Sequence, residues 1–280
     1  MPLASSSRIY FRVRPRGFVD AVRLVAAFVT SAFLKVAIPS RFRSVGLVVP
    51  GTRNLHIVID GIEFEVRPRT NDLDLVSPKH EPATTKWFKV QTDEVVVDVG
   101  AHIGRYTLMA AAKDARVIAI EPDPSNFRLL ERNVKLNGRS NVVLLSQAMT
   151  ARPGTLLLSP APPWNTGISS VRSDNEERLS NSSSSREVRV SGETLDNTVM
   201  ALGLRQIDWL KIDVEGHEIA ALEGGSSALD MTHRLILEVT DATDEVCRGI
   251  VARHGFALVA TESGGPARNL LLEKRSSMGE

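Results

Sequence analysis

Two kinds of hydrophobic pattern follow one another along the chain after residue 50. The first is a pair of runs in which apolar and polar residues alternate, LHIVIDGIEFEVRP (55–68), joined by Asp60-Gly61. An Asp-Gly pair between alternating runs is a strong signal for a β-hairpin. The second is a series of continuous apolar runs, rich in Val and Ile, each followed by a segment with helical spacing. Such runs are typical of strands buried on both faces of a parallel sheet.

The continuous runs predict a doubly wound α/β fold with a mostly parallel sheet and a terminal antiparallel strand. The expected strands are 92–104, 115–124, 141–149, 206–216 and 234–240, and the expected helices are 105–114, 125–138, 217–229 and 244–255. The last two strands, 256–261 and 269–274, are close together, so we expect them to pair antiparallel. Ser125 is placed to cap the second helix and Gly138 is placed to end it.

Between about residues 150 and 200 the alternation is interrupted. Short apolar runs are separated here by Pro, Gly and a serine tract. We interpret this region as an insertion that forms a lid within a single domain spanning 51–280. Trp164, with Asn165 beside it, is placed either to face a bound ring or to pack beneath the loop.

Residues 1–50 form a basic extension with a helix predicted over 18–44. Asp20 is the only acidic residue in it, against the basic residues Arg8, Arg12, Arg14, Arg16, Arg23, Lys35, Arg41 and Arg43. The uncharged run between Arg23 and Lys35 is shorter than the roughly 18–20 residues that span a bilayer. Two interpretations stay open: the helix packs on the main domain or in a homodimer, or residues 1–44 lie on an anionic membrane surface.

Composition narrows the class of protein. The 280 residues are 42% hydrophobic and 24% charged, which suits one large α/β domain with an extension. The net charge of +1 gives no electrostatic signal for nucleic acid. Cys247 is the single cysteine, which excludes an intrachain disulfide and a cysteine zinc cluster. We expect a cytoplasmic protein, membrane-peripheral if the extension binds lipid.

A nucleotide site is predicted at the first two strands of the alternating series. The first ends in DVGAHIG, which supplies Asp98, Gly100 and Gly104. Gly100 permits a tight turn, and Gly104 lets the next helix begin close to a ligand. Glu121 ends the second strand, where a carboxylate can accept hydrogen bonds from ribose hydroxyls.

Two cofactor classes compete for this site. A dinucleotide fingerprint has a glycine where this chain has His102, and that glycine lets the backbone approach a pyrophosphate. The substitution favours a cofactor without phosphates, such as S-adenosylmethionine. Asp98 would then engage the ammonium end, Glu121 the ribose, and Gln147 and Ala148 the adenine edge.

The fourth strand, in IDWLKIDVEGHE (207–218), ends in a group of titratable residues. Asp213, Glu215 and His217 gather at the carboxyl end of a central strand, with Glu238 at the end of the next. Asp213 is the first choice as general base, and His217 is the alternative. Asp213, Glu215 and Glu238 would suit Mg²⁺ or Ca²⁺. In the structural alternative, Lys211 pairs with one acid and Glu215 caps the following helix.

Four segments resemble the FkbM family of S-adenosylmethionine-dependent methyltransferases. They are VVVDVGAHIGRYTL, VIAIEPDPSNFRLLERNVKLNG, TLDN and WLKIDVEGHEIAALEG, within residues 90–240. The resemblance implies a class I methyltransferase fold and transfer to an oxygen, often a hydroxyl of a sugar, glycan or polyketide-type product. The expected cofactor-site residues are Asp98, Gly100, Ala101, His102, Gly104, Tyr106, Glu121, Pro122, Gln147, Ala148 and Asp213.

Other functions are less well supported by the residues. A nicotinamide oxidoreductase would use the same fold, but no Tyr-Lys or His-acid set for hydride transfer is evident. A non-catalytic, membrane-associated module is the other alternative, although the set of Asp98, Gly100, Gly104 and Glu121 is intact. Nucleic-acid methylation is disfavoured by the net charge and by DVEG after the fourth strand, where an aromatic-proline tetrapeptide would be expected.

Overall fold

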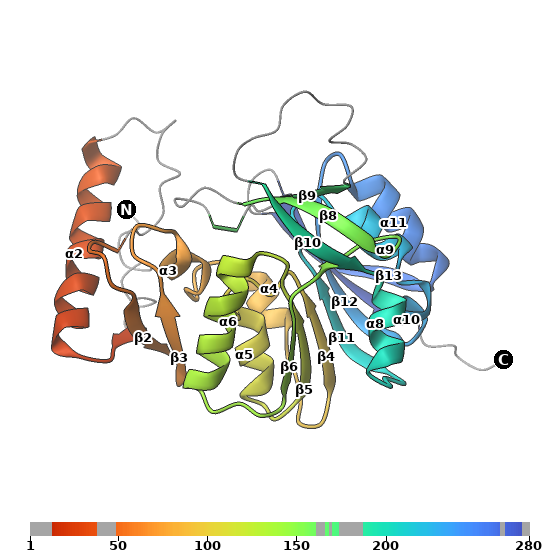
Figure 1. Ribbon diagram of the computed structural model, residues 1–280, viewed down its shortest axis with the longest axis horizontal. Helices are drawn as coiled ribbons and strands as arrows, with labels where there is room; N and C mark the ends of the chain where they lie inside the picture. The colour runs from red at the N-terminus through yellow and green to blue at the C-terminus, as the bar shows by residue number, and fades with distance from the viewer. Residues whose placement is uncertain are drawn as a thin grey trace.

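The computed structural model describes residues 13–37, 49–160, 166–167, 170–173, 187–263 and 267–275 (Figure 1). Its centre is a seven-stranded sheet with the order β13 (Phe256–Ser263), β14 (Ala267–Lys274), β12 (Thr232–Thr240), β11 (Ile207–Ile212), β4 (Val95–Val99), β5 (Arg116–Ile120), β6 (Val142–Leu145). Neighbouring strands from β12 to β6 are parallel. The last strand of the described residues, β14, is antiparallel to both β12 and β13. The predicted doubly wound sheet is confirmed.

Helices cover both faces of this sheet. They are α4 (Pro82–Trp87), α5 (Arg105–Ala111), α6 (Pro124–Leu136), α8 (Leu195–Ala201), α9 (Glu218–Glu223), α10 (Ser226–Asp230) and α11 (Asp244–Arg253). Successive strand residues point to opposite faces. Val97 accordingly packs in the core formed with α8 to α11, and Val96 packs in the core formed with α4 and α5. Burial on both faces explains why these strands are continuously apolar.

A small antiparallel sheet stands beside the central one. Its order is β1 (Val13–Pro15), β2 (Leu55–Ile59), β3 (Ile62–Val66). Asp60 and Gly61 both have positive φ, 50° and 85°, as a type I′ hairpin turn requires. The predicted hairpin is confirmed by the pairing of β2 with β3.

The predicted N-terminal helix is α2 (Phe18–Ala37), and it packs on this small sheet. Leu24 and Ala27 are buried in the same cluster as the inward residues of the hairpin. Residues 38–44 of the predicted helix lie outside the described part of the chain. Among the described helices, none combines the length and the apolar character that a membrane span needs.

Two asparagines, one in the last turn of α6 and one directly after it, fasten the hairpin to the main domain. Asn133 Oδ1 accepts a hydrogen bond from the Glu65 N–H at 2.7 Å, and Asn137 Oδ1 accepts one from the Glu63 N–H at 2.8 Å. Their amide groups also donate to the carbonyls of the same two residues. Backbone N–H and C=O groups at the edge of β3 are thus hydrogen-bonded by side chains, as they would be by a neighbouring strand.

The insertion at 150–200 contributes to a second, four-stranded sheet. Its order is β7 (Ala148–Met149), β10 (Val188–Glu193), β8 (Gly154–Ser159), β9 (Ser170–Ser173). Trp164 and Asn165, expected in the lid, lie outside the described residues.

Several predicted boundaries were wrong: the strand expected over 92–104 ends at Val99, and the helix expected over 217–229 is two helices, α9 and α10. The run 141–149 is not one strand, because the chain leaves the central sheet after Leu145 and enters the second sheet at Ala148. Helix α6 is capped by Asp123 and not by Ser125: Asp123 Oδ1 accepts the Ser125 N–H at 2.7 Å, and Pro124 takes the first helical position. Strand β11 ends at Ile212, since Glu215 and Gly216 turn with φ of 50° and 97°.

Candidate active site

A cavity of about 350 Å³ opens at the carboxyl ends of β4, β5, β11 and β12. Strand order reverses between β4 and β11, which is where α/β sheets bind ligands. The cavity walls include most of the residues predicted for the cofactor and for catalysis: Asp98, Gly100, Ala101, His102, Tyr106, Glu121, Pro122, Gln147, Ala148, Asp213, Glu215, His217 and Glu238. Gly104 is not among the residues that line it.

The two predicted loop glycines have different roles. Gly100 has φ of 82°, and a Cβ placed on it would lie 1.7 Å from the backbone oxygen of Asp213. It therefore allows the loop after β4 to touch the turn after β11. Gly104 has φ of 100°, and its Cβ would lie 2.8 Å from Leu130 Cδ1 of α6. Gly104 thus serves the start of α5 and its packing on α6.

Glu121 follows β5 and is held by backbone donors. Its Oε2 accepts the His102 N–H and its Oε1 accepts the Asp123 N–H, each at 2.8 Å. The carboxyl is almost fully buried, and burial raises its pKa to about 7 against the effect of these hydrogen bonds. These two bonds do not use all the acceptor positions of the carboxylate, so the group fits a ligand that presents hydroxyls.

Asp98 lies in β4 and is buried beneath the glycine loop. Its Oδ2 accepts a hydrogen bond from Thr107 Oγ at 2.6 Å, and its Oδ1 has no partner among the described residues. Burial raises the pKa of this carboxyl, opposed by the charge of Lys211. An unpaired buried oxygen at a cavity wall suits a ligand that brings a donor.

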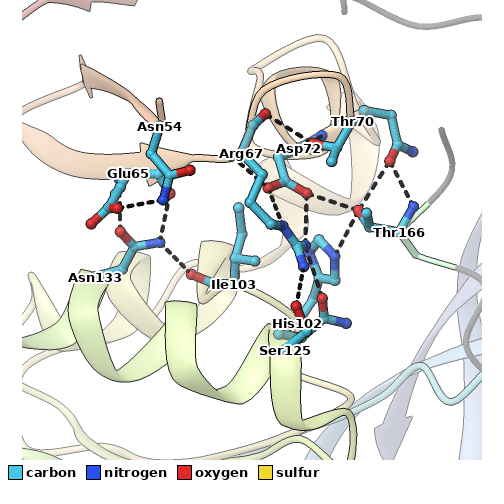
Figure 2. Close-up of polar contacts among 12 residues, drawn as sticks. Asn54, Glu65, Arg67, Thr70, Asp72, His102, Ile103, Ser125, Asn133 and Thr166 are labelled. Atoms are coloured by element: carbon cyan, nitrogen blue, oxygen red, sulfur yellow. Dashed lines mark hydrogen bonds and ion pairs between the residues drawn. The ribbon is translucent and has the colours of Figure 1, made fainter. Parts of the chain in front are cut away.

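His102 takes part in the loop through its backbone as well as its ring. Its φ is 51°, and its N–H is committed to Glu121. Its Nε2 lies 3.1 Å from Thr166 Oγ (Figure 2). Burial lowers the pKa of the imidazole to about 4, so the ring is neutral at pH 7.

The other end of the cavity is dominated by an ion pair between Lys211 and Asp213. Lys211 Nζ lies 2.7 Å from Asp213 Oδ2, and the lysine side chain is only 3% exposed. Burial would raise the pKa of Asp213, but the Lys211 ammonium lowers it overall. Asp213 is therefore ionised at pH 7, and it lines the cavity.

Two further carboxyls meet Asp213. Oxygens of Glu81, Asp213 and Glu238 all lie within 4.8 Å of one another. The charge of Asp213, with burial, raises the pKa of Glu238 to about 10. Glu238 consequently keeps its proton at pH 7 and shares a hydrogen bond with Asp213. This trio contains Glu81 where the sequence suggested Glu215.

Glu215 and His217 lie in the turn that leads into α9. Burial and the charge of Asp213 raise the pKa of Glu215 to about 8. His217 is the residue before the first turn of α9, and its Nε2 lies 3.4 Å from Thr150 Oγ. The residue that caps the turn is Glu218, whose Oε1 accepts the Gly216 N–H at 2.7 Å.

The sequence reasoning missed Glu81, which precedes α4 in an irregular segment. Its carboxylate accepts a hydrogen bond from Tyr106 Oη at 2.7 Å and one from Asn269 Nδ2 at 2.8 Å. Arg105, also missed, donates to the backbone carbonyls of Leu75 and His80 beside it. No periodic pattern marks Glu81, because its position depends on β14, about 190 residues later in the chain.

Gln147 lies at the cavity wall as expected for a residue against an adenine. Its Nε2 donates to Thr198 Oγ at 3.1 Å, which fixes the amide beside Ala148. Tyr106 is buried, with its ring 4.8 Å from Lys211 Nζ. Its hydroxyl donates a hydrogen bond to Glu81 at 2.7 Å.

Comparison with known proteins agrees with this geometry. A family model described as the methyltransferase FkbM domain matches residues 98–274. The hexuronic acid methyltransferase AglP of Haloferax volcanii is 29% identical over 157 residues, 56% of this chain and 60% of that protein. Methyltransferase 1 of Beauveria bassiana is 25% identical over 182 residues, 59% of this chain and 73% of that protein.

A solved structure, the putative transferase PH0793 of Pyrococcus horikoshii, matches with a TM-score of 0.45 and 16% identity over 88% of this chain and 81% of that one. The chain spans 60% of the length of AglP. The family match covers more than half of the chain and includes the glycine loop, Glu121 and the Asp213 turn. The chain therefore belongs to the FkbM family of S-adenosylmethionine-dependent methyltransferases.

Proposed function

We propose that this protein transfers a methyl group from S-adenosylmethionine to a hydroxyl of a sugar, glycan or other small molecule. The observation that carries the proposal is a single cavity with two chemically different ends. One end holds Glu121 and the glycine loop, and the other holds the ionised Asp213. The similarity to a hexuronic acid methyltransferase supports a carbohydrate acceptor.

The residues at the first end fit the cofactor. Glu121 would accept hydrogen bonds from the ribose hydroxyls. Asp98, through its unpaired oxygen, would accept a hydrogen bond from the ammonium group of the methionine part. Gln147 and Ala148 would face the adenine. When bound there, S-adenosylmethionine supplies a methyl group activated by the positive sulfonium.

The second end prepares the acceptor. Asp213, kept ionised by Lys211, accepts a hydrogen bond from the acceptor hydroxyl and takes its proton as the oxygen is methylated. The protonated Glu238 and the Tyr106–Glu81 pair restrict where that hydroxyl can lie. Alignment contributes several kcal/mol, and a positioned base contributes about 10²–10⁴-fold. Glu215 and His217 are the alternative bases.

We propose that the carboxyl trio works without Mg²⁺ or Ca²⁺. Lys211 Nζ, 2.7 Å from Asp213 Oδ2, already supplies a positive charge to this carboxylate. Addition of EDTA is therefore expected to leave methyl transfer unchanged. Stimulation by either cation, lost in Glu81→Gln, would contradict this and favour a metal site of Glu81, Asp213 and Glu238.

Calorimetric titration tests the cofactor assignment. We expect micromolar binding of S-adenosylmethionine and S-adenosylhomocysteine to the full chain, and clear weakening in Glu121→Gln. Glu63→Gln, which changes a carboxyl in the hairpin, is the control. Binding of NADH in place of both would support the oxidoreductase alternative.

For α2 we propose contact with an anionic lipid surface. Its outward face carries a stripe of exposed apolar residues, Phe18, Val19, Val22, Val25 and Val29, opposite the buried Leu24 and Ala27. The first fifty residues are strongly basic, and their charge has the sign that attracts such a surface.

Vesicle sedimentation tests this contact. The chain is expected to sediment with phosphatidylglycerol vesicles and not with phosphatidylcholine vesicles, and Val22→Asp with Val25→Asp is expected to abolish sedimentation. Val246→Asp, at an exposed valine of α11, is the control. If the α2 double variant sediments as well as Val246→Asp, lipid contact through this stripe is contradicted. If the unmodified protein has the mass of a dimer in solution and the α2 double variant has the mass of a monomer, the stripe is a homodimer interface instead.

A further inference from the structure

A buried ion pair joins the hairpin to the segment that follows it. Asp72, at the start of α3 (Asp72–Leu75), is fully buried and accepts three hydrogen bonds from Arg67, at 2.8–2.9 Å, through the backbone N–H, Nε and Nη2. Burial opposes ionisation, but the Arg67 guanidinium lowers the pKa of Asp72. Neither residue belongs to the central sheet or its helices, and neither was singled out in the sequence.

One arm of this pair reaches the cofactor end of the cavity through α6. Arg67 Nη2 donates to Asn126 Oδ1 at 2.8 Å, and its Nη1 donates to Ser125 Oγ at 3.1 Å (Figure 2). Asn126 lines the cavity, and its side chain lowers the pKa of the neighbouring Glu121 carboxyl, against the effect of burial. Arg67 therefore holds a side chain that in turn contacts Glu121.

A second arm runs through Thr166. Its hydroxyl lies 2.8 Å from Asp72 Oδ1 and 3.1 Å from His102 Nε2 (Figure 2). A hydroxyl has one proton, and an ionised carboxylate is its better acceptor. Thr166 thus donates to Asp72 and accepts from the His102 Nε2–H. The N–H of His102 then donates to Glu121.

Both arms end on the same carboxyl. We propose that Arg67, Asp72 and Thr166 are positioning residues for the cofactor. They hold the Asn126 side chain and the His102 N–H against Glu121, and so fix the orientation in which Glu121 meets the ribose. The inference rests on the proposed ribose contact of Glu121. It assigns a binding role to a region that lies outside the 98–274 family match, apart from Thr166.

The hairpin is held to the main domain by contacts other than the Arg67–Asp72 pair. An effect of this pair on cofactor binding can therefore be distinguished from an effect on folding. Asn133 and Asn137 bond the backbone of β3 independently of Asp72. Thr70 provides a matched control, because it is as buried as Thr166 and also bonds Asp72. Its Oγ accepts the Asp72 N–H at 3.2 Å and donates to the Arg67 carbonyl.

Binding of S-adenosylhomocysteine to variants of the full chain tests the proposal by calorimetry. Thr166→Val is expected to weaken binding about tenfold, since it removes the link between a charged group and the loop. Thr166→Ser keeps the hydroxyl and should restore affinity to within about twofold of the unmodified protein. Thr70→Val should lower the melting temperature and leave the affinity unchanged. Equal losses at both threonines would overturn the proposal.

A double-mutant cycle with Glu121→Gln locates the effect. If Thr166 acts through Glu121, adding Thr166→Val to Glu121→Gln should weaken binding by less than about twofold. Additive losses would overturn the positioning role. If Glu121→Gln itself binds like the unmodified protein, the ribose assignment fails. If only Glu121→Gln weakens binding, the assignment stands and the positioning role fails.

Discussion

The two ends of the cavity are assembled in different ways. The cofactor end comes from two successive strand-to-helix turns, so Asp98, Gly100 and Glu121 lie within about one βαβ unit. The other end, where the acceptor is proposed to bind, brings together the carboxyl groups of Glu81, Asp213 and Glu238, from three separate parts of the chain. Asn269 of β14 fixes the first of these. The proposed cofactor site can therefore be recognised from local spacing, whereas the proposed acceptor site depends on how the whole sheet closes.

The largest expected effect is at the acceptor end. Asp213→Asn should lower kcat by about 10²–10⁴-fold, because the hydroxyl loses its ionised acceptor. The affinity for S-adenosylhomocysteine should change by less than about threefold. Transfer of labelled methyl to a panel of monosaccharides and hexuronic acids measures the first quantity, and calorimetry measures the second. Full activity in Asp213→Asn would transfer the base role to Glu215 or His217.

A second effect concerns the contact between the two ends. Gly100→Ala should lower the free energy of unfolding by more than about 4 kcal/mol, since its Cβ would collide with the Asp213 carbonyl. Gly61→Ala has a similar φ but open space around it, so it should cost about 1–2 kcal/mol. Urea unfolding compares the two. Similar losses would mean that the loop and the turn do not touch.

The pH dependence of S-adenosylhomocysteine binding tests the role proposed for Glu121. The pKa of Glu121 is raised to about 7, so the carboxyl gains charge between pH 6 and pH 8. An ionised carboxylate is the stronger acceptor for ribose hydroxyls, so affinity for S-adenosylhomocysteine should rise about three- to tenfold over this range. Glu121→Gln should abolish the dependence. A pH dependence that survives in that variant would assign it to another group.

The smallest effect is expected at Glu238. This carboxyl is neutral at pH 7, because the charge of Asp213 raises its pKa to about 10. Glu238→Gln also places a neutral donor beside Asp213, so kcat should fall by less than about fivefold. The same methyl-transfer assay measures it beside Asp213→Asn. A loss as large as that of Asp213→Asn would show that Glu238 acts as a charged group.

The sequence predicted the sheet because strands buried on both faces must be apolar throughout, and the hairpin because Asp60-Gly61 suits its turn. It also predicted that Glu121 and Asp213 would share one edge of the sheet, since both follow parallel strands. Glu81 and Thr166 had no such signal. Their positions depend on contacts between distant segments, with Asn269 for the first and Asp72 for the second. The break after Leu145 was missed because apolar residues resume at Ala148 and Met149, although Ser146 and Gln147 interrupt the run.

A structure of the protein with S-adenosylhomocysteine bound would locate the cofactor relative to Glu121 and Asp213. We expect the ribose hydroxyls on the Glu121 carboxylate and the sulfur on the side of the cavity that faces Asp213. A cofactor bound away from Glu121, or one whose sulfur faces away from Asp213, would contradict this expectation.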